Sequence, residues 1–356
     1  MLPWAHGHQI KALAIKVEAI LERQTGNQAE LVRGLGNQEA GQKQLSRLIH
    51  NDRLDPRRLA DAVLDQALAQ LPRTGRVRVA LDWTIEDDQH LLVISLLLRG
   101  RAIPIFWRGY QASVLKGRMK MYEAAIIKRC VSRLRNVIGQ RRLILTADRG
   151  FADVEMCDLL DAQHVEYVLR AKANTKVFVN GAWLELREVG FITNARRRSL
   201  GRVRYCKSSP RLLCVGLSRE RNEKGVWEVW YLLSNRSRTG KQLASEYSRR
   251  FGCEEGFRDA KWLLGFAQAR VKDTRAWSRF FAMFAIALLI LLTLVQVVLL
   301  RDKDAAAQLL RRITSRRSGR PELSLITSML KIIQLDYQLF DFLIPHTLLS
   351  ESPCFL

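Results

Sequence analysis

Apolar residues in the first 75 positions recur at the spacing of amphipathic helices. Leu13, Val17 and Ile20 lie three or four positions apart, with mostly polar or small residues between them. Residues at this spacing share one face of a helix, so the pattern predicts helices with a buried side. Asp55 and Pro56 predict a helix start, because Asp caps the first turn and Pro is favoured at its first position. This region is therefore predicted to be helical.

The pattern changes to that of strands at residue 76. Short runs rich in apolar residues are separated by polar turns, and longer segments with helical spacing alternate with them. The predicted order is strands at 76–83, 90–98 and 102–107, a helix at 122–137, a strand at 143–148, a helix at 153–163 and a strand at 165–170. Three antiparallel strands followed by alternating helices and strands predict an α/β core with a mixed sheet.

Residues 171–240 contain several short runs with the two-residue period of strands, separated by Gly-containing turns. These runs predict a β-rich insertion. Trp227 and Trp230 would project from opposite faces of one strand, and core packing is the favoured interpretation for both. The basic stretch from Arg196 to Arg204 fits either a surface that follows a phosphate backbone or an exposed, solubilising loop.

A stripe of polar side chains is predicted on a helix that follows the insertion. Relative to Tyr247, the positions Arg250, Glu254 and Lys261 are rotated by roughly 300°, 340° and 320° around a helix that advances about 100° per residue. One face would then carry a phenol, a guanidinium, a carboxylate and an ammonium, which suits a metal-bound phosphodiester. Glu255 would point about 100° away from Glu254, so Glu254 is the better candidate ligand. Solvated charges, or an ion pair between Arg250 and Glu254, are the alternatives.

Two aspartates end or nearly end apolar runs of the predicted core. Asp82 follows the alternating run that begins at residue 76, and Asp148 follows the continuous apolar run that begins at Leu143. Functional sites of α/β sheets collect where strands end, so these carboxylates are candidate site residues. Asp153 begins a predicted helix, where capping is its ordinary role.

The charge of the chain points to a polyanionic partner. The 356 residues include 58 Lys and Arg against 35 Asp and Glu, giving a formal net charge of +23. Nucleic acid is the leading candidate, and binding should then weaken steeply with salt. The six cysteines contain no CxxC pair, so neither a zinc site nor a disulfide framework is indicated. This favours a reducing, cytoplasmic environment.

These residues resemble those of DDE transposases, specifically of bacterial insertion sequence family 4. The resemblance rests on Asp82 in Leu-Asp-Trp-Thr, on Asp148 in Ala-Asp-Arg-Gly-Phe and on the pattern Y-x2-R-x3-E-x6-K, and it spans roughly residues 76–300. It implies a ribonuclease-H-like mixed sheet flanked by helices, interrupted by a β-rich insertion, with helical N- and C-terminal regions. In the best-studied members the residue after the signature Arg is Trp and helps to process DNA hairpins. Here it is Phe251, which leaves hairpin chemistry open.

The resemblance and the patterns together divide the chain into five regions. They are a helical DNA-binding region at 1–75, the first part of the catalytic core at 76–170, the β-rich insertion at 171–240, the second part of the core at 241–300 and a helical region at 301–356. In the last region, Arg311, Arg312, Arg316 and Arg317 fit DNA binding. Its apolar face, Ile326, Met329, Leu330 and Ile333, fits either dimerisation or packing against the core.

The resemblance implies two Mg²⁺ ions, with Mn²⁺ as a substitute, held by three carboxylates. Asp82 would bridge both ions, and Asp148 and Glu254 would each complete one. Hard cations prefer such oxygen ligands, and three clustered carboxylates repel one another without metal. The site is therefore expected to be loose until metal binds.

The DNA contacts implied by the resemblance lie close to these carboxylates. Arg250 and Lys261 would hold phosphates that flank the scissile bond, and Tyr247 would bind a phosphate or stack on a base. Arg149 and Arg258 are further candidates for DNA binding.

The resulting hypothesis is a cut-and-paste transposase that acts on the terminal inverted repeats of an insertion sequence and on target DNA. Bringing two ends together implies at least a dimer on DNA. A ribonuclease-H-like nuclease without strand transfer and a non-catalytic, domesticated DNA-binding protein are the alternatives.

One segment, Phe280 to Leu300, is almost wholly apolar and long enough to cross a bilayer. No other segment resembles a span, and the family has a buried core helix at this place. We therefore predict a core helix in a cytoplasmic, nucleoid-associated protein without a membrane anchor.

Overall fold

The computed structural model describes residues 2–300 and 324–335, together with Leu310, apart from short gaps at 34–36, 73, 99, 193–194 and 223. The candidate DNA-binding residues Arg311, Arg312, Arg316 and Arg317 lie outside the described residues, as does Cys354.

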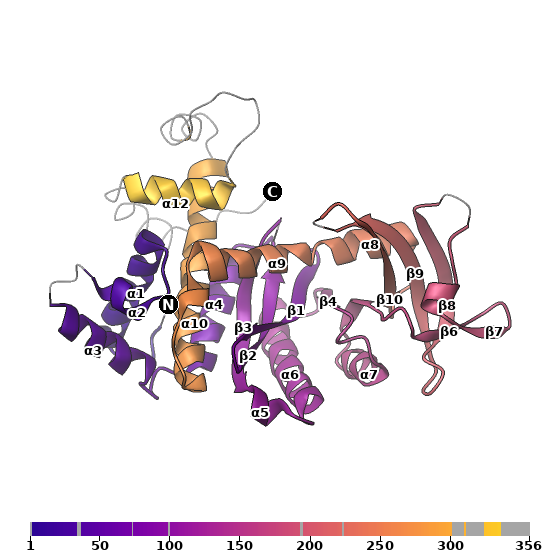
Figure 1. The fold of residues 1–356 in the computed structure, drawn as a ribbon, viewed down its shortest axis with the longest axis horizontal. Helices are drawn as coiled ribbons and strands as arrows, with labels where there is room; N and C mark the ends of the chain where they lie inside the picture. Colours follow the sequence, from indigo (N-terminus) through magenta and orange to yellow (C-terminus); the bar gives the residue numbers. More distant parts are fainter. Residues whose placement is uncertain are drawn as a thin grey trace.

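The N-terminal region is helical, as predicted. It contains α1 (Gly7–Arg23), α2 (Gln28–Val32), α3 (Gln38–Ile49) and α4 (Pro56–Ala69). The predicted start at Asp55 is confirmed, because its side chain caps α4 by accepting a hydrogen bond from the Arg57 amide at 2.9 Å and Pro56 opens the helix. Together with α10, these helices lie at one end of the molecule (Figure 1).

The predicted α/β core is confirmed. It contains β1 (Val77–Glu86), β2 (Gln89–Leu97), β3 (Ala102–Gln111), the short α5 (Ala112–Leu115), α6 (Met119–Ile138), β4 (Leu143–Ala147), α7 (Val154–Ala162) and β5 (Glu166–Arg170). Strands β1 to β3 are antiparallel, and β4 runs parallel to both β1 and β5. Asp153 caps α7 through the Met156 amide at 2.8 Å, which confirms its predicted capping role.

The β-rich insertion extends the core sheet rather than forming a separate one. Its strands are β6 (Lys176–Val179), β7 (Ala182–Glu185), β8 (Arg197–Tyr205), β9 (Arg211–Arg221) and β10 (Trp227–Ser234). The ten strands form one sheet in the order β3-β2-β1-β4-β5-β10-β9-β8-β6-β7, because β10 pairs with β5. The insertion therefore lies beside the carboxyl-terminal part of the core and at the opposite end from α3 (Figure 1).

Two expectations for the insertion are corrected by the structure. The basic stretch is not a loop, because Arg197 to Tyr205 pair with β9 along their whole length. Trp230 is buried at 3% exposure, as predicted, but core packing is wrong for Trp227, which is 54% exposed. Side chains three residues apart on a strand point to opposite faces, so Trp227 points away from the face on which Trp230 is buried.

The predicted signature helix is not one regular α-helix. It consists of α8 (Gly240–Ser248), α9 (Phe251–Arg258) and a π-helical turn at Asp259–Leu263, which follow one another across the sheet (Figure 1). Tyr247 lies in α8, Arg250 in the turn before α9, and Lys261 in the π-helical turn. The assumption of a constant 100° per residue is therefore wrong across Tyr247 to Lys261.

The long apolar segment is a core helix, as predicted. α10 (Thr274–Leu294) continues into a π-helical turn at Val295–Leu300, and its buried residues belong to the main hydrophobic core. Among the described residues, Thr274–Leu300 is the one helix long and apolar enough to cross a membrane. Its Arg279 is 4% exposed and donates to the carbonyls of Ile49 and Leu54 and to Asp52, so this helix carries a buried charge bonded to the N-terminal region.

The apolar face of the C-terminal region also packs inward. In α12 (Leu325–Leu335), the predicted face of Ile326, Met329, Leu330 and Ile333 is at most 2% exposed and belongs to the same core. α12 contacts α1 and α10. Of the two predicted roles for this face, packing against the core is the one that the structure supports.

Candidate active site

The two candidate aspartates lie at equivalent positions on neighbouring strands. β1 and β4 are parallel, and Leu81 pairs with Ala147. Asp82 and Asp148 each follow one of these paired residues, so they lie beside each other on the same face of the sheet, where neighbouring strands are about 4.8 Å apart. The amide of Trp83 donates to Asp82 Oδ1 at 3.0 Å, and the amide of Gly150 donates to Asp148 Oδ1 at 2.8 Å. Each carboxylate is therefore oriented by its own backbone.

Helix α9 brings the third carboxylate to the sheet. Two of its glycines, Gly252 and Gly256, lie against the start of β3: a Cβ at Gly252 would lie 3.0 Å from the Arg101 carbonyl, and one at Gly256 would lie 2.9 Å from the Ala102 carbonyl. A larger residue at Gly256 would push the helix outward. This close approach positions Glu254 over the ends of the central strands.

Arg250 connects the first and third carboxylates. Its Nη2 lies 2.7 Å from Asp82 Oδ2, and its Nη1 donates to Glu254 Oε1. The ion pair between Arg250 and Glu254, weighed above as an alternative, is therefore present, and it extends to a residue 168 positions earlier in the chain. The guanidinium is 7% exposed, so this contact is largely shielded from water.

The three carboxylates act on one another electrostatically. Burial, together with the charges of Asp148 and Glu254, raises the pKa of Asp82 to about 6, while Arg250 opposes the rise. Burial lowers the pKa of Arg250, but the negative charges of Asp82 and Glu254 outweigh it and raise this pKa above its ordinary value. An excess of negative charge at this place favours a cation.

The donor set suits a hard divalent ion, because all three candidate ligands are carboxylates. Within the described part of the chain, no three His, Cys, Asp or Glu side chains converge closely enough to form a metal site. Instead, the Arg250 guanidinium lies between Asp82 and Glu254. The predicted roles of Asp82, Asp148 and Glu254 as metal ligands stay predictions, and they require the carboxylates to draw together.

A cavity of about 380 Å³ opens beside these carboxylates. Its lining joins the signature residues to the insertion and consists of Arg170, Arg221, Asn222, Glu228, Tyr247, Arg250, Phe251 and Glu254. Trp230 packs beneath it, with its ring centroid 5.1 Å from that of Tyr247 and 5.6 Å from that of Phe251. The cavity therefore has basic and aromatic walls, which suit a nucleotide with its phosphate.

Tyr247 is more enclosed than the sequence implied. It is 3% exposed, and burial raises its pKa to about 12, with Arg250 opposing. Trp230 packs against the ring, so little of Tyr247 is exposed to the cavity.

The remaining candidate DNA contacts lie at the surface around the site. Lys261 Nζ lies 2.5 Å from Glu86 Oε1, and Arg258 Nη2 lies 2.6 Å from Glu255 Oε1. Arg149 is exposed directly after Asp148. Arg170 and Arg221 line the cavity but were not singled out from the sequence, because single arginines on strands carry no recognisable spacing.

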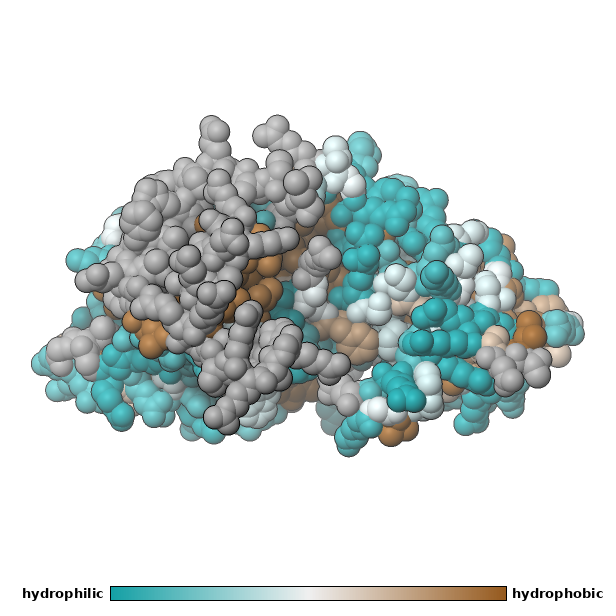
Figure 2. Space-filling view, turned by 90° about the horizontal axis from the view of Figure 1, so that it is seen from above, coloured by the Kyte–Doolittle hydropathy of each residue, from teal (hydrophilic) through white to brown (hydrophobic). Residues whose placement is uncertain are grey.

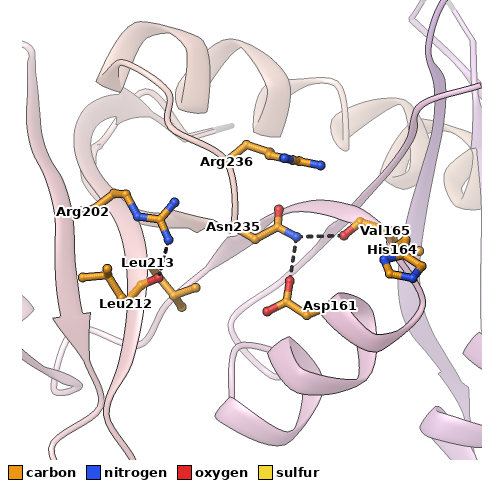
Figure 3. Close-up of a pocket in the computed structure, with 8 residues that line it drawn as sticks. All are labelled: Asp161, His164, Val165, Arg202, Leu212, Leu213, Asn235 and Arg236. Carbon is orange, nitrogen blue, oxygen red and sulfur yellow. Dashed lines mark hydrogen bonds between the residues drawn. The ribbon is translucent and has the colours of Figure 1, made fainter.

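A second cavity, of about 280 Å³, lies away from the carboxylates (Figure 3). It is lined by Asp161, His164, Val165, Arg202, Leu212, Leu213, Asn235 and Arg236. Its polar groups are mutually bonded: Asn235 donates to Asp161 Oδ1 at 2.8 Å and to the Val165 carbonyl at 2.9 Å. These bonds connect α7 to the segment after β10, which is a structural role.

The insertion presents a basic surface on the side of the molecule that is mostly hydrophilic in Figure 2. Trp227 lies between two guanidinium groups, 5.8 Å from that of Arg196 and 4.9 Å from that of Arg221. Because Arg221 also lines the cavity, this surface is continuous with the candidate site.

One family model, described as a transposase DDE domain, matches residues 113–290, which is half of the 356-residue chain. The matched part includes Asp148 and Glu254 and begins after Asp82. No curated protein matches the chain.

Proposed function

The chain belongs to the transposase DDE domain family, and on this premise we propose that it catalyses cut-and-paste transposition of an insertion sequence of family 4. It binds the terminal inverted repeats, hydrolyses a phosphodiester at each end and joins the freed 3′-hydroxyl to target DNA. Hydrolysis consumes one water and breaks the bond between phosphorus and the 3′-oxygen. Joining exchanges one phosphodiester for another, so it requires no further reactant.

The observation that carries the proposal is that Arg250 contacts both Asp82 and Glu254, while the charge of Asp148 also acts on Asp82. These residues come from β1, the end of β4 and α9, and the charges of Asp148 and Glu254 both act on Asp82. A structural ion pair needs one carboxylate for one guanidinium. The two carboxylates beyond that number add negative charge, which a phosphodiester-cleaving site would use to hold metal cations.

We propose that Asp82, Asp148 and Glu254 would hold two Mg²⁺ ions, with Mn²⁺ as a substitute. When bound, such ions activate the attacking hydroxyl and stabilise the leaving oxygen. The residues of the chain bind and orient the DNA. Arg250 would hold the phosphate next to the scissile bond with its planar fork, and the wall formed by Tyr247 would limit the movement of the neighbouring nucleotide.

Further DNA contacts are proposed at Lys261, Arg149 and Arg258, which surround the site, and in the helical region 1–75. The net charge of +23 supports a polyanionic partner. Two ends must be processed together, so we propose at least a dimer on DNA. The protein would act in the cytoplasm, at the nucleoid.

The test uses labelled duplexes taken from the DNA that borders the gene, incubated with purified protein and Mg²⁺. We expect nicking by the wild type and by Asp87→Asn, a control in the exposed turn after β1. We expect no nicking, but unchanged DNA binding, by Asp82→Asn, Asp148→Asn and Glu254→Gln. Wild-type activity in any of these three variants would refute the role of that residue.

Adding an unlabelled target plasmid separates the alternatives. Joined products support a transposase, nicking without joining indicates a nuclease, and specific binding without nicking indicates a non-catalytic DNA-binding protein.

A further inference from the structure

A buried carboxylate lies on the other face of the sheet from the candidate ligands. Glu123 on α6 is 2% exposed, and its Oε1 accepts a hydrogen bond from Trp83 Nε1 at 2.9 Å. Because successive residues of a strand point to opposite faces, Trp83 faces α6 while Asp82 faces α9. Glu123 therefore fixes Trp83, the residue next to Asp82, from the opposite face of the sheet.

Lys120 connects this carboxylate to the segment that carries Asp148. Its Nζ lies 3.0 Å from Glu123 Oε2 and 2.7 Å from Asp153 Oδ2, and it donates to the Gly150 carbonyl at 3.1 Å. An ammonium has three protons, and these three acceptors match them in number. Phe151 contributes an aromatic face 5.7 Å from the same nitrogen.

The segment that Lys120 binds is the turn that orients Asp148. The amide of Gly150 donates to Asp148 Oδ1, and the amide of Phe151 donates to the Asp148 carbonyl at 3.1 Å. Asp153 ends this turn as the cap of α7. Lys120 thus contacts both the middle and the end of the turn, and through Glu123 it also contacts Trp83.

We propose that Lys120 and Glu123 are positioning residues that fix Asp82 and Asp148 relative to each other, an inference that rests on the proposed function. Neither side chain bonds to either aspartate. They act through Trp83 on β1 and through the Gly150 carbonyl after β4. Two carboxylates can hold metal at one site only if the distance between them is well defined. Residues that orient metal ligands typically contribute 10–100-fold to metal affinity or activity.

The variants distinguish three possible roles of Lys120: positioning of the aspartates, packing of the fold and direct contact with DNA. Lys120→Met removes the ammonium from a side chain that is 44% exposed, so little packing is lost. Lys120→Met combined with Glu123→Gln leaves no buried charge without a partner, while the Gln carbonyl still accepts from Trp83. Lys120→Arg is the conservative rescue, and Lys128→Met removes an exposed ammonium from the same helix as the matched control.

Each variant is studied as the full-length protein. Mn²⁺ affinity is measured by isothermal titration calorimetry and DNA affinity by fluorescence anisotropy. The melting temperature is measured by scanning calorimetry, and the nicking rate is measured at saturating DNA. We expect Lys120→Met and the double variant to lose about 10–100-fold in Mn²⁺ affinity and in nicking rate. DNA affinity should stay near the wild-type value in both variants. The melting temperature should stay near wild type in the double variant and fall in Lys120→Met, because the buried Glu123 then lacks its cationic partner. Lys120→Arg should recover most of the loss, and Lys128→Met should behave as wild type.

Unchanged Mn²⁺ affinity and nicking in the double variant would overturn the positioning role. A loss confined to DNA affinity would also overturn it, because it would make Lys120 a phosphate contact. A wild-type protein that neither binds Mn²⁺ nor nicks would overturn both this inference and the proposed function. Nicking by the wild type, together with normal Mn²⁺ binding by Lys120→Met, would overturn this inference alone.

Discussion

Arg250 Nη2 lies 2.7 Å from Asp82 Oδ2, while the other arm of the same guanidinium contacts Glu254. The two carboxylates that are proposed to hold metal therefore share an internal cation. A guanidinium and a divalent ion compete for the same oxygens, so metal binding and the Arg250 contact are coupled.

Replacing Arg250 should strengthen metal binding while impairing catalysis. In Arg250→Gln we expect Mn²⁺ affinity, measured calorimetrically without DNA, to rise about tenfold, because removing one nearby competing charge changes the binding free energy by about 1.4 kcal/mol. Nicking should fall, since the fork that orients the phosphate is lost. Arg258→Gln is the control for the Mn²⁺ measurement without DNA, where its affinity should match that of the wild type, because Arg258 pairs with Glu255 and not with a proposed ligand. Equal or weaker Mn²⁺ binding by Arg250→Gln would contradict the competition.

Metal binding should depend on pH through Asp82. Burial raises its pKa to about 6, with Arg250 opposing and Asp148 and Glu254 adding to the rise, whereas an Asp in an unfolded chain titrates near 4. Only the ionised form is a ligand, so we expect Mn²⁺ affinity to fall by about fivefold between pH 6 and pH 5 and to change little between pH 7 and pH 8.

The raised pKa of Asp82 also makes the free energy of unfolding depend on pH. The folded protein binds this proton more tightly than the unfolded chain, so the contribution of Asp82 to the free energy of unfolding decreases as pH rises from about 4 to 6. Urea unfolding of the wild type and of Asp82→Asn over this range measures it. Identical pH profiles for the two proteins would show that Asp82 does not titrate there.

Arg279 should be essential for stability. Its replacement by Met leaves the buried carbonyls of Ile49 and Leu54 without their donor, and each buried acceptor left unsatisfied costs about 1–3 kcal/mol. Urea unfolding followed by circular dichroism measures this loss. Asp52→Asn should cost less than about 1 kcal/mol, because the Asp52 side chain is 80% exposed. Wild-type stability of Arg279→Met would contradict the bonding described for α10.

DNA binding should weaken with salt, and Lys261 should contribute to the slope. If Lys261 exchanges Glu86 for a phosphate, Lys261→Met should lower affinity and reduce the slope of log K against log salt by about 0.9. Fluorescence anisotropy at several salt concentrations measures both. Lys128→Met should leave the slope unchanged, and an unchanged slope in Lys261→Met would remove that residue from the interface.

The periodicity of the chain was enough to predict the helices of the N-terminal region and the strands around Asp82 and Asp148, because their apolar spacing reflects which side is buried. The burial of α10 was instead predicted from the family resemblance, because an apolar run of this length also fits a membrane span. β8 was not predicted because its arginines suggest a loop, although its backbone pairs with β9 along its length. The insertion and the core form one sheet because β5 pairs with β10. This pairing joins strands that are distant in the sequence, so local sequence patterns do not predict it.

The site was predicted in its components but not in its arrangement. The order of Asp82, Asp148 and the signature identified the carboxylates, since their spacing along the chain is distinctive. The break after Ser248 and the π-helical turn at Asp259 carry no Gly or Pro signal that would reveal them. The contact of Arg250 with Asp82 and the support from Lys120 depend on how distant segments pack, which a single sequence does not specify.

The central claim is that Asp82, Asp148 and Glu254 together hold the catalytic metal. Anomalous diffraction from crystals of the protein with an end duplex and Mn²⁺ tests it most directly. We expect Mn²⁺ peaks about 2.0–2.2 Å from oxygens of all three carboxylates, with Arg250 moved onto a phosphate. Mn²⁺ peaks at other residues, with Arg250 still between Asp82 and Glu254 in the DNA complex, would contradict it.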